Sequence, residues 1–150
     1  MRTINDSRAG TRAGSKRTED SGLHAMPAWS GRARILVIDD EPLLGRTLSF
    51  MLEESHDVVV VDGGAEALKH LGEDTRFDLV LCDLDMPGVN GSSVHTAMAD
   101  RHPELVPRFV LMTGGACSDW AEEFLARYSG ARLEKPFSAA DVEQVLALVG

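Results

Sequence analysis

Apolar and polar positions follow one another along this 150-residue chain in blocks whose lengths are typical of strands and helices. Five short apolar runs, several rich in β-branched residues, predict five strands. Between and after them, apolar residues recur every three or four positions, which predicts amphipathic helices. The predicted strands cover residues 34–38, 57–61, 78–82, 108–113 and 131–133. The predicted helices cover residues 42–54, 63–72, 92–102, 118–128 and 138–149.

This alternation of strands and helices predicts an α/β fold. Apolar strands separated by amphipathic helices are typical of a parallel sheet covered on both faces, so we expect a doubly wound five-stranded sheet. Residues 1–31 differ, because they are rich in Arg, Gly, Ser and Thr and show no periodicity. We expect them to form a disordered tail or a linker. The folded domain is then expected to span residues 32–150.

Composition and charge narrow the class of protein. Hydrophobic residues make up 43% and charged residues 26% of the chain, which is normal for a globular domain. The sequence has no apolar run near the ~20 residues that a membrane span needs and no secretory signal, and its two cysteines, Cys82 and Cys117, form no disulfide framework. A cytoplasmic location is therefore expected. The net charge of -9 argues against nucleic acid as a direct partner.

Polar residues suited to phosphate chemistry stand where the predicted strands end. Asp39 and Asp40 follow the first strand, Asp83 the third and Lys135 the fifth, while Thr113 closes the fourth. In a doubly wound sheet these ends share the edge where ligands bind. Carboxylates gathered there repel each other unless a cation joins them, and oxygen ligands suit Mg²⁺. A hydroxyl and an ammonium would suit a phosphoryl group, which an Asp carboxylate can accept.

Each of these residues also has an ordinary structural interpretation when it is taken alone. Asp40 would serve as a helix cap, Thr113 as a hydroxyl at a strand end and Lys135 as a surface charge.

Two further expectations concern packing. The aromatic line Trp120, Phe124 and Tyr128 is expected to lie mainly in the core. The five histidines, at positions 24, 56, 70, 95 and 102, show no ligand spacing and are expected at the surface.

Four motifs carry a resemblance to a known family. They are "ILVIDDEP", "DLVLCDLDMPGVNG", "FVLMTGG" and "LEKPF", which occur in this order within about residues 33–150 and each close a predicted strand. Together they resemble the receiver domain of two-component response regulators, the CheY-like family. The resemblance implies a flavodoxin-like sheet of strand order 2-1-3-4-5. It also implies a signalling domain that takes a phosphoryl group from a phosphohistidine.

The resemblance implies a metal site and a phosphoacceptor. Asp83 matches the phosphoacceptor of the family. Asp39 and Asp40 match the acidic pair that binds Mg²⁺ together with Asp83, and the backbone carbonyl of Asp85 matches the remaining protein ligand. Mg²⁺ is therefore the expected cofactor.

The resemblance also assigns residues that respond to the phosphoryl group. Thr113 matches the switch hydroxyl, and Lys135 matches the lysine that pairs with the phosphoryl group, with a cis bond expected before Pro136. One position departs from the family, because Arg132 stands where a Tyr or Phe usually lies. In the family this ring turns inward when the switch hydroxyl moves. A guanidinium cannot enter the same apolar slot without a partner, so we expect a phosphate relay or sink and not a switch that dimerises through its fourth and fifth helices.

An alternative class and two contexts accompany this interpretation. "DLDMP" also resembles the Asp-x-Asp signature of haloacid-dehalogenase-type phosphatases, but that family places its nucleophile early and its paired acids last, and here the order is reversed. We therefore expect a signalling domain and not a turnover enzyme. The expected partner is a histidine kinase or a histidine phosphotransfer protein, and the expected state is a monomer. A stand-alone regulator and the C-terminal receiver of a hybrid histidine kinase both remain open.

Overall fold

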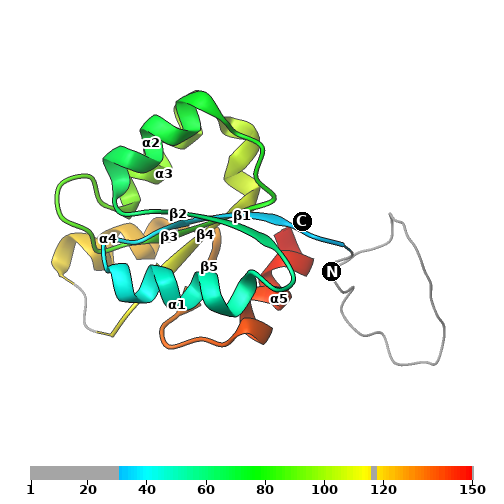
Figure 1. Ribbon diagram of the computed structural model, residues 1–150. Coiled ribbons are helices and arrows are strands. Elements are labelled where there is room, and N and C mark those ends of the chain that lie inside the picture. Colours follow the sequence, from blue (N-terminus) through cyan, green and yellow to red (C-terminus); the bar gives the residue numbers. More distant parts are fainter. Residues whose placement is uncertain (1–30, 116–117, 150) are drawn as a thin grey trace, which may run out of the picture.

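The computed structural model describes residues 31–115 and 118–149, in which one parallel sheet carries helices on both faces (Figure 1). The strand order is β2-β1-β3-β4-β5, which confirms the expected doubly wound sheet. The strands are β1 (Arg34–Ile38), β2 (Asp57–Val61), β3 (Leu79–Asp83), β4 (Phe109–Thr113) and β5 (Ala131–Glu134). The helices are α1 (Pro42–Leu52), α2 (Gly64–Glu73), α3 (Gly91–Arg101), the short 3-10 helix η1 (Pro103–Arg108), α4 (Asp119–Arg127) and α5 (Ala139–Val149).

The sheet separates two apolar cores. Side chains alternate between its faces, so that Leu36 and Ile38 of β1 enter one core while Ile35 and Val37 enter the other. The first core also contains residues of α2, α3 and α4, and the second contains residues of α1 and α5. Figure 1 shows α2 and α3 on one side of the sheet and α1 and α5 on the opposite side. Burial on both faces explains why the strands are nearly continuous apolar runs.

Strand register brings the polar strand ends to one edge, which we call the rim. Ile38 of β1 pairs with Cys82 of β3, so Asp39 and Asp83 follow at the same end of the two neighbouring strands. Thr113 at the end of β4 pairs with Glu134 of β5, and Lys135 follows directly. The parallel register therefore places residues that are far apart in sequence side by side.

Most boundaries agree with the sequence pattern to within two residues. A capping box begins α5, because the Ser138 N–H donates to Asp141 Oδ2 at 2.8 Å and the Asp141 N–H donates to Ser138 Oγ at 3.2 Å. The sequence pattern missed η1, which contains two prolines and no helical period. Residues 1–30 and Cys117 lie outside the described residues, so the tail stays a prediction.

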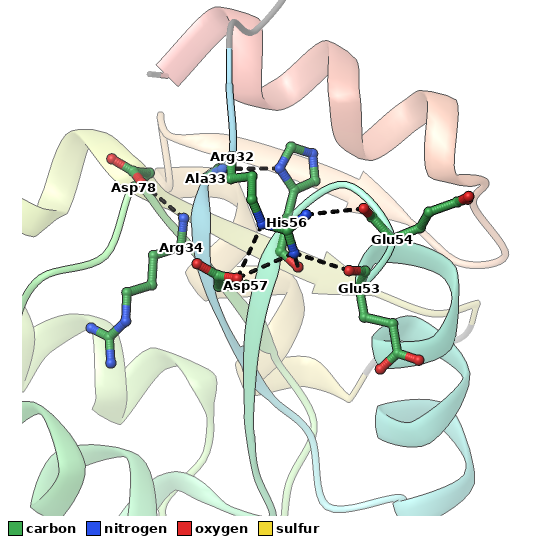
Figure 2. Close-up of polar contacts among 8 residues, drawn as sticks. All are labelled: Arg32, Ala33, Arg34, Glu53, Glu54, His56, Asp57 and Asp78. Carbon is green, nitrogen blue, oxygen red and sulfur yellow. Dashed lines mark hydrogen bonds and ion pairs between the residues drawn. The ribbon is translucent and has the colours of Figure 1, made fainter.

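At the end of the sheet opposite the rim, the chain enters β1 through a dense polar contact (Figure 2). The Arg32 side chain donates to Asp57 Oδ1 at 3.2 Å and to the carbonyls of Glu53 at 3.1 Å, Glu54 at 3.0 Å and His56 at 2.9 Å. Carbonyls that follow a helix have no intrahelical donor. Arg32 therefore supplies hydrogen-bond donors to the carbonyl groups that follow α1, and it fixes the direction in which the chain enters the domain.

His56 contradicts the expectation that the histidines lie at the surface, because only 2% of it is exposed. Its Nδ1 accepts the N–H of Ala33 at 3.0 Å, as Figure 2 shows. The ring proton therefore lies on Nε2, which contacts a carboxylate oxygen of Glu143 on α5. The side chain thus joins Ala33, the residue before β1, to α5 through polar contacts at both ring nitrogens.

The aromatic residues of α4 are buried unevenly. Tyr128 is buried, and its hydroxyl donates to the carbonyl of Ala131 at 2.8 Å. Phe124 is half-buried and stacks on Tyr128, with ring centroids 5.5 Å apart. Trp120 is exposed at 39%. The core interpretation is therefore confirmed for Tyr128, while Trp120 faces outward. Among the described residues, each helix is too short or too polar to cross a membrane.

Candidate functional site at the rim

Three of the predicted site residues meet at the rim. Lys135 Nζ lies 3.2 Å from Asp39 Oδ2 and 3.2 Å from Asp83 Oδ1, so one ammonium bridges two carboxylates. Asp39 is only 1% exposed and Asp83 only 6%. These side chains come from the ends of β1, β3 and β5, so the fold assembles the contact from segments that lie far apart in the sequence.

The rim also gathers oxygen atoms that suit a cation. Carboxylate oxygens of Asp39, Asp40 and Asp83 all lie within 4.8 Å of one another. Asp39 Oδ1 accepts the N–H of Glu41 at 2.9 Å, which fixes that carboxylate in place. Three carboxylates facing one ammonium leave an excess of negative charge, which a divalent cation would compensate. Oxygen-only donors of this kind fit Mg²⁺, which commonly takes one or two carboxylates and keeps several waters.

Burial and neighbouring charges set the protonation of the site. Burial raises the pKa of Asp83, Lys135 lowers it and the Asp39 carboxylate raises it, with the result that the pKa rises from 3.8 to about 6. Burial alone would lower the pKa of Lys135, but the carboxylates of Asp83 and Asp39 outweigh it and raise the pKa. Near neutral pH the rim therefore carries an ionised Asp83 held against a charged lysine.

Asp85 and Thr113 lie in the same cleft as these charges. The cleft has a volume of about 310 Å³ and is open to solvent. It is lined by Asp40, Glu41, Asp83, Leu84, Asp85, Thr113, Gly114, Gly115, Ser118, Ala121 and Lys135. Thr113 is 8% exposed, and its carbonyl accepts the N–H of Lys135 at 2.7 Å. The bond between Lys135 and Pro136 is cis, as expected. The side chain of Asp85 is exposed.

Arg132 lies on the surface and finds partners at the end of α4. Its Nη2 donates to the carbonyl of Leu125 at 3.1 Å and to that of Tyr128 at 3.2 Å. Its guanidinium carbon lies 5.8 Å from the centre of the Tyr128 ring. Arg132 therefore binds the C-terminal carbonyls of α4, and the expectation that it would not enter an apolar slot is confirmed.

Sequence reasoning missed two closely packed glycines, Gly64 and Gly91. Each stands at the first position of a helix, α2 and α3 respectively, and each lies against the chain between β3 and α3. The sequence signals were weak, because Gly64 follows another glycine and Gly91 reads as part of an Asn-Gly turn. Their importance is visible only in the distances to neighbouring backbone atoms.

Comparisons with known proteins place this architecture in a family. The family model of the response regulator receiver domain matches residues 35–147. The chain belongs to the receiver-domain family of two-component response regulators.

Individual relatives show the same domain in several contexts. The chain is 39% identical over 114 residues to the DNA-binding response regulator MtrA of Mycolicibacterium smegmatis, covering 74% of this chain and 47% of MtrA. It is 32% identical over 126 residues to the sensor protein GacS of Pseudomonas syringae, covering 80% of this chain and 14% of GacS. The chain thus spans less than half the length of these curated relatives.

A solved structure agrees as well. A response regulator receiver domain protein from Clostridium thermocellum superposes with a TM-score of 0.67 at 28% identity, covering 78% of this chain and 93% of that one.

Proposed function

We propose that this receiver domain accepts a phosphoryl group on Asp83 from the phosphohistidine of a histidine kinase or a histidine phosphotransfer protein. The observation that carries the proposal is the contact between Asp83, Lys135 and the carboxylates of Asp39 and Asp40 at the rim. A carboxylate in that setting is ionised near neutral pH, and it lines an open cleft. It is therefore able to act as a nucleophile.

The transfer forms one bond and breaks another. An oxygen of the Asp83 carboxylate attacks phosphorus, and the bond between phosphorus and the histidine nitrogen breaks. The electron pair of that bond returns to the imidazole, and the product is an aspartyl phosphate. Lys135 already contacts Asp83 Oδ1 and stabilises negative charge that gathers on the phosphoryl oxygens. Thr113 lines the same cleft, and its hydroxyl can donate a hydrogen bond to one of those oxygens.

Asp39, Asp40, Asp83 and the backbone carbonyl of Asp85 are the groups that would hold Mg²⁺. When bound, the ion supplies positive charge that neutralises the phosphoryl oxygens in the transition state. The burial of Asp39 and its hydrogen bond to Glu41 keep one ligand fixed before the ion arrives. Lys135 keeps the carboxylates of Asp39 and Asp83 together at the rim.

The output we propose is a phosphate relay within the cytoplasm. Arg132 is bound to the carbonyl groups at the end of α4 and presents no ring that could turn inward toward Thr113. Passing the phosphoryl group to or from a histidine partner needs only the rim and a docking surface. The acidic net charge of -9 also argues against direct contact with nucleic acid. We expect the domain to work as a monomer that signals through protein contacts.

The surface beside the rim suits a helical protein partner. Leu43 and Phe50 of α1 are 71% and 78% exposed, which is unusual for large apolar side chains. They lie seven residues apart. An α-helix completes about two turns in seven residues, so both side chains face the same side of α1. This apolar stripe starts three residues after Asp40. We propose it as the docking surface for the bundle that carries the phosphohistidine.

Labelling with a small phosphodonor tests the proposal. The wild-type protein incubated with acetyl phosphate and Mg²⁺ should gain one phosphoryl group, detected as a mass increase that is lost in mild base. Asp83→Asn should abolish the gain. Asp100→Asn is the matched control, because it neutralises an exposed carboxylate near the end of α3 that does not line the cleft, and it leaves the acceptor intact. Labelling of Asp83→Asn at the wild-type level would show that the acceptor lies elsewhere.

A further inference from the structure

The segment between β3 and α3, residues 84–90, lies at the rim and carries Asp85. It is held at its base by two backbone hydrogen bonds. The Leu84 N–H donates to the carbonyl of Met112 on β4 at 3.0 Å, and the Gly91 N–H donates to the carbonyl of Leu84 at 2.9 Å. Gly88 has a φ of 72°, a left-handed conformation that favours glycine. We call residues 84–90 the β3–α3 loop.

The start of α2 presses on this loop at Gly64. A Cβ added at Gly64 would lie 2.2 Å from the carbonyl oxygen of Val89 and 2.7 Å from its Cγ1. A real Cβ is essentially never found closer than 3.0 Å to such atoms. The first clash is with backbone, which cannot rotate away as the end of a side chain could. Any larger residue at Gly64 must therefore move α2 or the loop.

The start of α3 presses on the loop from its base. A Cβ added at Gly91 would lie 2.5 Å from the carbonyl oxygen of Asp83 and 2.7 Å from the Cα of Leu84. Next to it, Asn90 caps α3 by accepting the N–H of Ser93 at 3.0 Å. The loop is therefore confined between two helix starts, and in both cases the absence of a side chain permits the close approach.

We infer that Gly64, together with Gly91, positions the β3–α3 loop so that the backbone of Asp85 faces the Mg²⁺ site. The inference rests on the proposed function, since it concerns the metal site of the same rim. Gly64 is not among the residues that line the cleft, and the atoms nearest to a Cβ placed on it belong to Val89, so its contribution passes through Val89 and the loop. Residues that orient metal ligands from outside the ligand set commonly change metal affinity about 10-fold to 100-fold when altered.

The chain offers two matched controls for a Gly64→Ala variant. Gly72 lies on the same helix, and a Cβ there would meet nothing within 4 Å. Gly45 lies on α1, and a Cβ there would lie 2.8 Å from Cγ1 of Val60. Val60 belongs to β2, and the contact does not include the β3–α3 loop. Gly45→Ala therefore strains the packing without touching the loop. Alanine is also the better helix former, so helix propensity cannot explain a loss in either α2 variant.

The experiment measures Mg²⁺ affinity by calorimetric titration of the whole chain, with the amide signals of residues 84–90 followed by NMR in the metal-free state. Gly64→Ala should weaken Mg²⁺ binding about tenfold or more, and it should shift the loop amides before any metal is added. Gly72→Ala and Gly45→Ala should bind Mg²⁺ as the wild type does, whatever their thermal stability. Gly91→Ala should resemble Gly64→Ala.

Several results would overturn the inference. Wild-type affinity in Gly64→Ala, or an equal loss in Gly45→Ala, would show that Gly64 acts only through general packing. If Gly64→Ala fails to fold, Val89→Ala serves instead, since it removes the Cγ atoms of Val89 that lie against Gly64 and adds no atoms. It should weaken binding in the same direction by less, and unchanged affinity would refute the inference. Absence of Mg²⁺ binding in the wild type would instead refute the proposed function, and this inference with it.

Discussion

The raised pKa of Asp83 predicts that removing its charge stabilises the metal-free domain. A rise from 3.8 to about 6 corresponds to about 3 kcal/mol of unfavourable free energy for the ionised form, at about 1.4 kcal/mol per pKa unit. Because Asp83 borders an open cleft, solvent screens part of this cost. We therefore expect Asp83→Asn to raise the free energy of unfolding by about 1–2 kcal/mol near pH 7.5.

The sign of the pH dependence follows from the direction of the shift. The folded state holds the Asp83 proton more tightly than the unfolded state. The contribution of this proton to the free energy of unfolding is therefore fully present below the unfolded pKa near 4. It is lost as the pH rises through the folded pKa of about 6. Asn carries no titrating proton, so its advantage over the wild type should be near zero at pH 4 and reach its full size above pH 7.

Urea unfolding followed by circular dichroism, without metal, measures this difference at about pH 4 and about pH 7.5. All other carboxylates titrate in both proteins. The stability difference between Asp83→Asn and the wild type, compared at the two pH values, therefore reports the titration of Asp83. Saturating Mg²⁺ should reverse the difference at pH 7.5, because only the wild type keeps the full set of carboxylates. An advantage of the same size at both pH values, or a less stable variant at pH 7.5, would refute the reasoning.

Two further predictions concern partners and assembly. Phe50→Ala should slow phosphotransfer from a cognate histidine partner by about fivefold or more, because truncating a central anchor of an interface costs over about 1 kcal/mol. Labelling by acetyl phosphate should not change. Equal slowing with both donors would show that Phe50 acts in the folding of the site and not in docking. Addition of beryllofluoride with Mg²⁺ should leave the sedimentation coefficient that of a monomer. A shift to a dimer that is abolished by changes in α4 or α5 would contradict the relay proposal.

The fold could be predicted from the sequence because its signals are local. Each strand is a short apolar run, and the alternation of such runs with amphipathic helices predicts a parallel sheet. The strand order was expected only from the resemblance to the family. The acidic residues, Thr113 and Lys135 could be placed on one rim for the same reason, since parallel strands end on one edge. The side chains of Asp39, Asp83 and Lys135 do meet there. The roles assigned to them remain proposals.

Other features depend on contacts between distant residues and left no local signal. His56 is buried because Ala33 and Glu143 satisfy both of its ring nitrogens, and these partners are 23 and 87 residues away in the sequence. The pattern around η1 contains prolines and no period, so a helix was not expected there. The close approaches of Gly64 and Gly91 depend on how two helices meet one loop, which no single stretch of sequence contains.

The Arg32 contact has a practical consequence for attaching this domain to a surface or a reporter. Arg32 holds the entry to β1 at the end of the sheet that lies opposite Asp83, and α5 finishes on that same side of the fold (Figure 1). A tether fused before residue 32 would therefore emerge with a defined direction, on the side away from the cleft. A layer of molecules immobilised in this way would present the cleft and Asp83 outward, accessible to a soluble protein.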